Sequence, residues 1–277
     1  NPNGIAVYSL VPDKGLFADR TYEFRLLIGG EQKESTEYAA PAGQRIPGGD
    51  MEGSLTCFTT NNRDTESWGS GNNGMKQNLC APGSFPGTVG SQCAKLTSSV
   101  TIGILASGNL FFGTFLFQDL TGTVGFGQKY VYTARPSALK FKYHATVGKV
   151  DQNRHKGPLA IGEQDVSQVF VCIVDWSARH NVVSGLSAAS GMWSPAEQKD
   201  LDGSGAIIAY GILPIDKTTA GNSLVQAEIP LQYYDREAAA PTGKYTLVIS
   251  CSTSAYGDYM NGCSENVMYI DDFEWAY

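Results

Sequence analysis

The stretch ALKFKYHATV, residues 138–147, alternates apolar and polar side chains along its length. The two sets fall on opposite sides of an extended chain, with Phe141, Tyr143, Ala145 and Val147 on one side and Lys140, Lys142, His144 and Thr146 on the other. Successive side chains of a β-strand point to opposite faces, so a period of two is the period of a strand. The pattern predicts a strand that covers a core on one side only.

The stretch VSQVFVCIVDW, residues 166–176, is apolar at both odd and even positions, which is typical of a central strand covered on both faces. The most apolar segment, residues 98–117, is interrupted by Ser107, Gly108 and Asn109, and therefore predicts two strands and a turn rather than a membrane span. Further strands are predicted at residues 206–213, 223–234, 244–254 and 266–277. Because helical periodicity is almost absent, we expect an all-β fold, an antiparallel β-sandwich or jelly roll.

The first forty residues differ in character from the rest. Residues 10–30 read as a turn and a strand, and resemble the closing β-hairpin of a fibronectin type III or immunoglobulin-like domain. So short a segment cannot form that whole domain, so it is either a remnant or a set of strands donated to the main sandwich. Residues 38–49 then carry two prolines and three glycines, which predicts a linker. We therefore expect an N-terminal β segment over residues 1–43 and a main domain over residues 44–277.

Charge and cysteine content exclude some functions. The formal net charge is −7, with only 20 Lys and Arg, so nucleic acid is not an expected partner. The six cysteines show no CxxC spacing, which argues against a zinc site. Strand phase marks Cys172 and Cys251 as small buried hydrophobes, and a disulfide among Cys57, Cys80 and Cys93 stays open. The first residues are not an export signal, so we expect any such signal to have been removed.

Several motifs occur together in a fixed order from about Arg45 onward. They are IPGGDMEG (46–53), SWGSGN (67–72), ASGNLFFGTF (106–115), ARPSALKFKYHA (134–145), AIIAYG (206–211), IPLQYYD (229–235), STSAYGDYMNG (252–262) and NVMYIDDFEWAY (266–277). In this the chain resembles the "putative carbohydrate metabolism domain" of exported and surface lipoproteins from gut-dwelling anaerobic bacteria.

The resemblance implies a jelly roll akin to carbohydrate-binding modules, and a role in handling glycans. It also implies a place outside the cytoplasm, at the outer-membrane surface or in the periplasm, with membrane attachment only through a lipid anchor on the precursor. No catalytic residue is carried over from the family. The chain departs from the family pattern at GDMEGSLTC, where an aromatic residue commonly follows the Glu.

A sugar-binding site needs flat aromatic rings for the apolar faces of pyranose rings, and carboxylates or amides for the hydroxyls. Loops at the ends of a sandwich are where such sites gather. The candidates are Trp68 and Asn72 in RDTESWGSGNNG, Trp193 in GMWSPAEQ, and Tyr256, Asp258, Tyr259 and Asn261 in SAYGDYMNG. The alternative for Trp68 is a structural plug on the sheet edge, and for the last group a tight turn kept for packing.

Two groups of acidic residues are candidates for a structural calcium, and no other cofactor is expected. Asp200, Asp202 and Ser204 in DLDGSG fit the first positions of an EF-hand loop, but Gly211 stands where the bidentate Glu should be. An ordinary Asp-Gly turn is the alternative. Asp271 and Asp272 are adjacent carboxylates, which repel unless a cation compensates them or the strand points them to opposite faces.

The sequence contains no GxSxG, HExxH, Walker or GxGxxG motif, and its three histidines lie far apart. A glycosidase needs only two facing carboxylates, and Asp175 and Glu265 are the pair we would name. The leading hypothesis is therefore non-catalytic carbohydrate binding by an exported protein. The alternatives are a glycoside hydrolase or lyase with an acid pair, and a surface adhesion or assembly protein that presents its loops to a protein partner.

Overall fold

The computed structural model describes residues 18–101, 103–186, 189–195, 200–201, 205–234 and 240–277. Among these residues every strand pair is antiparallel, and the helical elements are two 3₁₀ turns, η1 (Thr56–Phe58) and η2 (Gly257–Tyr259). The predicted all-β antiparallel sandwich of jelly-roll type is confirmed. No helix in the described part of the chain is long and apolar enough to cross a membrane.

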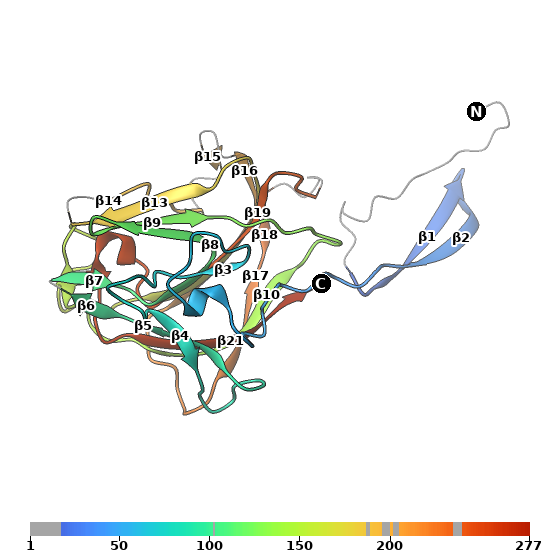
Figure 1. Ribbon diagram of the computed structural model, residues 1–277. Coiled ribbons are helices and arrows are strands. Elements are labelled where there is room, and N and C mark those ends of the chain that lie inside the picture. Colours follow the sequence, from blue (N-terminus) through green and yellow to red (C-terminus); the bar gives the residue numbers. More distant parts are fainter. Residues whose placement is uncertain (1–17, 102, 187–188, 196–199, 202–204, 235–239) are drawn as a thin grey trace.

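Two sheets form the sandwich (Figure 1). The five-stranded sheet has the order β17 (Val225–Pro230), β10 (Ala138–Thr146), β21 (Val267–Ala276), β5 (Cys93–Thr97), β4 (Cys80–Gly83). The ten-stranded sheet has the order β14 (Ala189–Ser190), β13 (His180–Gly185), β9 (Thr121–Phe126), β8 (Asn109–Gln118), β19 (Tyr245–Ser252), β12 (Ser167–Trp176), β16 (Gly205–Ile215), β15 (Asp200–Leu201), with β18 (Gln232–Tyr233) on β16 and β3 (Trp68–Gly69) on β8. Two small pairs, β6 (Ser99–Thr101) with β7 (Ile104–Ala106) and β11 (Gln152–Asn153) with β20 (Asn261–Gly262), lie outside these sheets.

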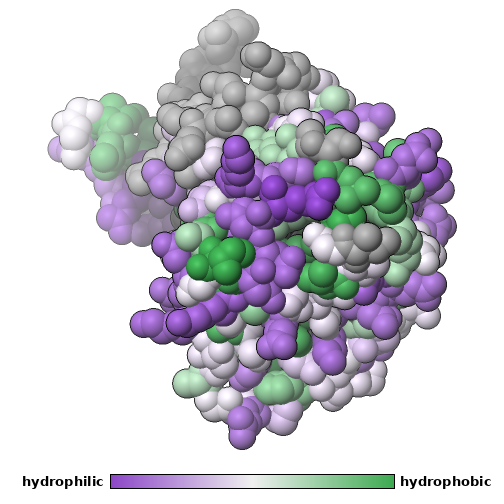
Figure 2. All heavy atoms as spheres, turned by 90° about the vertical axis from the view of Figure 1, so that its left-hand side faces the viewer, coloured by the Kyte–Doolittle hydropathy of each residue, from purple (hydrophilic) through white to green (hydrophobic). Residues whose placement is uncertain are grey.

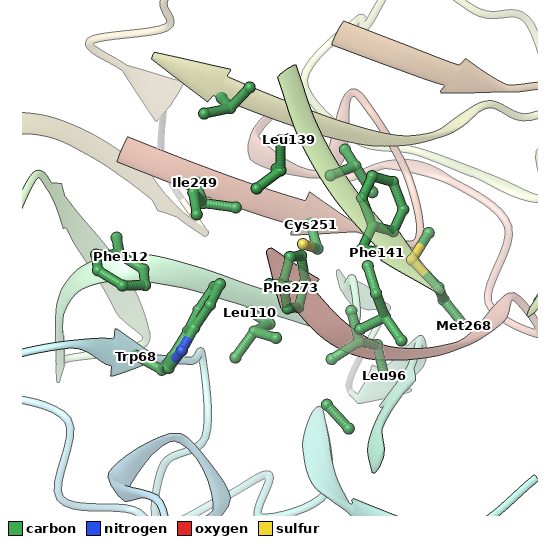
Figure 3. Packing of buried hydrophobic residues seen from close by; sticks show 14 of the residues in the cluster. Trp68, Leu96, Leu110, Phe112, Leu139, Phe141, Ile249, Cys251, Met268 and Phe273 are labelled. Carbon is green, nitrogen blue, oxygen red and sulfur yellow. The ribbon is translucent and has the colours of Figure 1, made fainter. Parts of the chain in front are cut away.

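The main core fills the space between the two sheets (Figure 3). The five-stranded sheet contributes Leu96, Leu139, Phe141, Met268 and Phe273, and the ten-stranded sheet contributes Leu110, Phe112, Leu247, Ile249 and Cys251. Burying each large apolar side chain stabilises the fold by about 1.5–3 kcal/mol. The predicted one-sided strand is β10, whose Phe141 and Ala145 are buried, although His144 on its other face is also covered, by the ring of Phe85.

Both faces of β12 are covered, as its sequence predicts. Val169 and Val171 point into the main core, whereas Phe170, Cys172, Val174 and Trp176 belong to a second cluster on the opposite face of the sheet. The face of the ten-stranded sheet that points away from the five-stranded sheet is therefore apolar over part of its area. We call it the outer face.

The N-terminal strands β1 (Thr21–Ile28) and β2 (Glu31–Ala39) pair with each other, and the hairpin projects away from the sandwich (Figure 1). The predicted hairpin appendage is thus present. The following segment lies against the sandwich, because Tyr130 Oη donates a hydrogen bond to the Gln44 carbonyl and Ile46 is buried in the main core. All six cysteines are buried free thiols in this structure, so it contains no disulfide among Cys57, Cys80 and Cys93.

Candidate functional site

The outer face of the ten-stranded sheet carries a groove with a cavity volume of about 250 Å³. Its floor follows from strand alternation. Since Leu110 and Phe112 of β8 point into the core, the odd-numbered residues point outward, and Phe111, Phe115 and Phe117 line the groove. Strands β9, β12, β13 and β19 add outward-facing residues, and the β6–β7 hairpin and the loop at residues 255–260 add further lining residues.

Figure 2 shows the end of the sandwich at which β6, β7, β9 and β14 lie in Figure 1. Apolar patches gather there among hydrophilic surface. Phe115 and Phe117, near the end of β8, both line the groove and are half-buried rather than fully enclosed. Apolar side chains of the groove are therefore within reach of a ligand from solvent.

Part of the groove is bounded by an aromatic cluster that we define as Phe126, Phe170, Trp176, His180 and Trp193. The ring of Trp193 lies 5.9 Å from Phe126, 5.9 Å from Phe170, 5.2 Å from Trp176 and 5.1 Å from His180. Burial lowers the pKa of His180, which keeps this imidazole neutral at pH 7. The indole Nε1 of Trp193 is buried and has no hydrogen-bond partner among the described residues.

A polar spot lies around Gly257, and we define it as Ser107, Ser252 and Asp258. A Cβ on Gly257 would lie 2.4 Å from Ser107 Oγ, so a glycine is needed for the loop to approach so closely. Ser107 is 6% exposed, and within the described part of the chain its hydroxyl has no partner. Burial raises the pKa of Asp258 to about 6, although the hydrogen bond donated by the Tyr259 N–H acts in the opposite direction and lowers it. The spot thus offers an unpaired hydroxyl and a carboxyl that titrates near neutral pH.

Two of the predicted sugar-binding residues, Trp193 and Asp258, line this groove although 64 residues lie between them in the sequence. Tyr256 and Tyr259 are half-buried on the same loop as Asp258, but their side chains do not line the groove. The structure therefore brings one aromatic ring and one carboxylate of the candidate residues into the same groove and leaves the two tyrosines outside it.

The prediction for Trp68 is wrong. Its side chain is fully buried and lies in the main core with Phe112 and Phe273 (Figure 3). The centre of a Trp68 ring lies 4.4 Å from that of Phe112 and 4.9 Å from that of Phe273. The indole Nε1 donates a hydrogen bond of 2.9 Å to the Pro47 carbonyl. No face of the ring is left for a sugar, so Trp68 is the structural plug that the sequence offered as its alternative.

Asn72 and Asn261 are also interior residues, which corrects the prediction for both. The Asn72 amide donates to the carbonyls of Cys57 and Cys80 and accepts from the Cys80 N–H. The Asn261 amide donates to the carbonyls of Gln152 and Leu159. Because their hydrogen bonds are used within the protein, neither amide is available to a ligand.

The predicted catalytic pair is wrong as well. Asp165, just before β12, accepts a hydrogen bond from the Cys263 N–H, and so places the loop that carries Glu265 at the start of this strand. Asp175 lies at the other end of β12, roughly 30 Å away at about 3.3 Å per residue, and accepts a hydrogen bond from the Gly243 N–H. Acid pairs of glycosidases lie within about 10 Å of each other.

No three His, Cys, Asp or Glu side chains gather around a metal site in the described residues. Asp200 belongs to β15, which pairs with the start of β16, whereas Asp202 and Ser204 lie outside the described residues. Calcium binding there stays a prediction.

The adjacent carboxylates Asp271 and Asp272 point to different surroundings, which relieves their repulsion without a metal. Asp272, at φ 59°, forms an ion pair of 2.9 Å with Lys142. Asp271 is fully buried. Its Oδ2 accepts a hydrogen bond from the Val89 N–H, and its Oδ1 has no partner within the described chain. Burial raises the pKa of Asp271 to about 6, and the charges of Asp272 and Glu52 also raise it.

We expect Asp271→Asn to stabilise the protein at pH 7 by about 1–2 kcal/mol. The carboxyl pKa is about 3.9 in the unfolded chain and about 6 in the folded protein, so between pH 4 and 6 the folded state binds the proton more tightly. This contribution to stability is full below pH 4 and is lost as pH rises through 6. Melting temperatures from pH 4 to 7.5 check it. The variant should lose the fall in stability between pH 4 and 7.5 that is caused by Asp271. A pH profile unchanged from that of the wild type would contradict the raised pKa of this carboxyl.

The sequence did not identify Phe115, Phe117 or Ser107 as site residues. The signal was present in ASGNLFFGTFLF, where residues 111, 115 and 117 are aromatic in the opposite phase to Leu110 and Phe112. A strand that is apolar on both faces indicates two covered faces, and nothing in the pattern distinguishes a second core from a groove.

Comparison with known proteins agrees with this architecture. Residues 50–276 match the family described as "Putative carbohydrate metabolism domain". A crystal structure from Bacteroides thetaiotaomicron VPI-5482, described as "a putative glycoside hydrolase", aligns at 16% identity and a TM-score of 0.51 over 93% of this chain and 78% of that one. A second one with the same description, from Bacteroides vulgatus ATCC 8482, aligns at 19% identity and a TM-score of 0.53 over 76% of this chain and 85% of that one.

At these identities the two structures show a shared fold and nothing further. Among curated proteins, none is similar enough in sequence to match the chain. The family match covers most of the residues, including both sheets of the sandwich. The chain therefore belongs to the "Putative carbohydrate metabolism domain" family, and its function is carbohydrate-related.

Proposed function

We propose that this protein binds a carbohydrate in the groove of the outer face and does not cleave it. The observation that carries the proposal is the combination of accessible aromatic side chains with buried, unpaired polar atoms in one groove. Aromatic rings cover the apolar faces of sugar rings, and a polar atom that lacks a partner in the free protein gains one when a hydroxyl binds. Trp193 Nε1 and Ser107 Oγ are such atoms.

Hydrolysis is the second candidate, because a pKa of about 6 is suited to a general acid and Asp258 has one. A glycosidase also needs a second carboxylate as base or nucleophile, about 5–10 Å from the first. Among the described residues that line the groove, Asp258 is the single carboxylate. Binding is therefore the function that the described geometry supports better.

The test is a screen on a glycan array followed by titration calorimetry on the sugars that bind. We expect Asp258→Asn and Trp193→Phe each to weaken binding about tenfold, since each removes one polar interaction with the ligand, worth about 1.5 kcal/mol. The matched control is Asp64→Asn, an exposed acid outside the groove, which should bind as the wild type does. Absence of binding to any glycan would contradict the proposal, and release of reducing sugar would support hydrolysis instead.

We also propose that the protein acts outside the cytoplasm, at the outer-membrane surface or in the periplasm. The support is the resemblance to exported lipoproteins, together with a function that requires access to environmental glycans. Cell fractionation with an antibody against the chain tests it. Recovery of the protein in the cytoplasmic fraction would contradict it.

A further inference from the structure

Most polar side chains along the groove are already hydrogen-bonded within the protein. Ser252 donates to the Ser254 carbonyl, Ser254 to Asp165, and Ser184 to the Asp258 carbonyl. Further examples are Lys76, which donates to Ser99, and Asn109, which donates to the Ser107 carbonyl and accepts from the Gly71 N–H. A hexose carries several hydroxyls, and each needs a partner when it is buried. Fewer polar groups are therefore left for a sugar than the groove contains, and two that keep unused capacity, Ser107 and Asp258, lie at the polar spot.

Much of the groove wall is apolar. Phe115 and Phe117 are nearly parallel neighbours on β8, with centroids 6.4 Å apart and planes at 23°. Val124 on β9 and Leu120 in the β8–β9 turn continue this surface, and Ile104 of the β6–β7 hairpin also lines the groove. A wall of this kind binds hydrocarbon, at a gain of about 0.8 kcal/mol per buried methylene.

Leu120 supplies a second, independent observation. Gln118 pairs with Thr121, so the turn between β8 and β9 has two residues, Asp119 and Leu120, with φ values of 50° and 58°. Positive φ at both positions defines a type I′ turn, which strongly favours Gly at the second position. A leucine there costs about 1–2 kcal/mol. Strained residues of this kind persist where they serve a function, and the side chain of Leu120 lines the groove.

Resting on the proposed function, we infer that the ligand of the groove is a sugar that carries an apolar substituent, an acyl, alkyl or aryl group. The sugar lies at the polar spot, where Ser107 and Asp258 contact its hydroxyls. The substituent lies along the apolar wall formed by Phe115, Phe117, Leu120 and Val124.

The test is a calorimetric titration with methyl, butyl and hexyl β-glycosides of glucose, galactose and mannose, below their micelle concentrations, with hexanol as the sugar-free probe. We expect the affinity to rise about fourfold per added methylene, which is the factor that corresponds to 0.8 kcal/mol. Methyl glycosides that bind as tightly as hexyl glycosides would overturn this inference and leave the proposed function intact. Hexanol binding as tightly as hexyl glycosides, or no binding of any glycoside, would overturn both.

Leu120→Gly makes the test specific, because stability and affinity should change in opposite directions. The variant creates the preferred Asp-Gly turn, so its melting temperature should rise, while its affinity for the hexyl glycoside should fall about tenfold. A second variant, Phe117→Ser, should lose affinity similarly. Its control is Leu116→Ser. Leu116 is the preceding residue on β8, is 37% exposed and faces away from the groove, so this variant should bind the hexyl glycoside as the wild type does. Unchanged affinity in both groove variants would overturn the inference.

Discussion

Trp68→Ala should lower the free energy of unfolding by about 3–5 kcal/mol. The side chain is fully buried between Phe112 and Phe273, so its removal leaves a large cavity in the main core. It also leaves the Pro47 carbonyl without the indole donor. Chemical denaturation followed by fluorescence of the remaining tryptophans measures the loss.

The control for this change is Ile161→Ala, because Ile161 is 62% exposed and its truncation should change stability by less than about 0.5 kcal/mol. A Trp68→Ala protein of wild-type stability with weakened glycan binding would contradict the core position of Trp68. It would restore this residue to the binding surface.

Trp68 also shows why loop composition is a poor guide to exposure. Its loop is rich in polar residues and glycine, which indicates a solvated segment. In the structure these polar side chains bond to backbone groups instead: Thr65 to the Trp68 carbonyl, Ser70 to the Cys57 carbonyl, and Asn62 to the Thr59 carbonyl and the Ser70 N–H. The polar residues satisfy the backbone of a buried loop, and this allows the indole to enter the core.

The strands were predictable because each one depends on a local property of the sequence, the alternation of apolar and polar residues. Residues 138–147 show a one-sided pattern and residues 166–176 a two-sided one, and both became strands close to the predicted positions, Ala138–Thr146 and Ser167–Trp176. The alternation of apolar and polar residues indicates which face of a strand is covered. It does not indicate what covers that face, so the outer face of β8 could be recognised as apolar but not as a groove.

The site depends on contacts between distant residues, which one sequence does not record. Trp193 and Asp258 share a groove because they follow β14 and β19, two strands of the same sheet, and both line its outer face. Asp175 and Glu265 were named as an acid pair on residue type alone, yet they lie near opposite ends of β12. Residue type identified the candidates, and only the strand order decides which of them meet.

Asp165→Ala should be as destabilising as the loss of Trp68, about 3–5 kcal/mol, and should also abolish binding in the groove. Asp165 is fully buried, and its carboxylate accepts hydrogen bonds from Ser254 Oγ, Asn266 Nδ2 and the N–H groups of Val166 and Cys263, at 2.7–2.8 Å. Removing it takes this acceptor away from all four donors, of which Ser254 Oγ and the Cys263 N–H are bonded to it in the buried interior. Since Ser254 and Cys263 stand at the two ends of the loop that carries Asp258, the polar spot loses its support together with the fold.

Two variants separate this role from a general effect of charge near the loop. Asp165→Asn keeps one acceptor oxygen and should lose about half as much stability as Asp165→Ala. Asp151→Ala removes an exposed acid that accepts a hydrogen bond from the Ser264 N–H of the same segment, and exposed acids contribute little, so it should stay within about 0.5 kcal/mol of the wild type. Denaturant midpoints measure the stabilities, and protease cleavage within residues 254–263 reports on the loop. If Asp165→Ala and Asp151→Ala behaved alike, the buried carboxylate would not be what holds the polar spot in place.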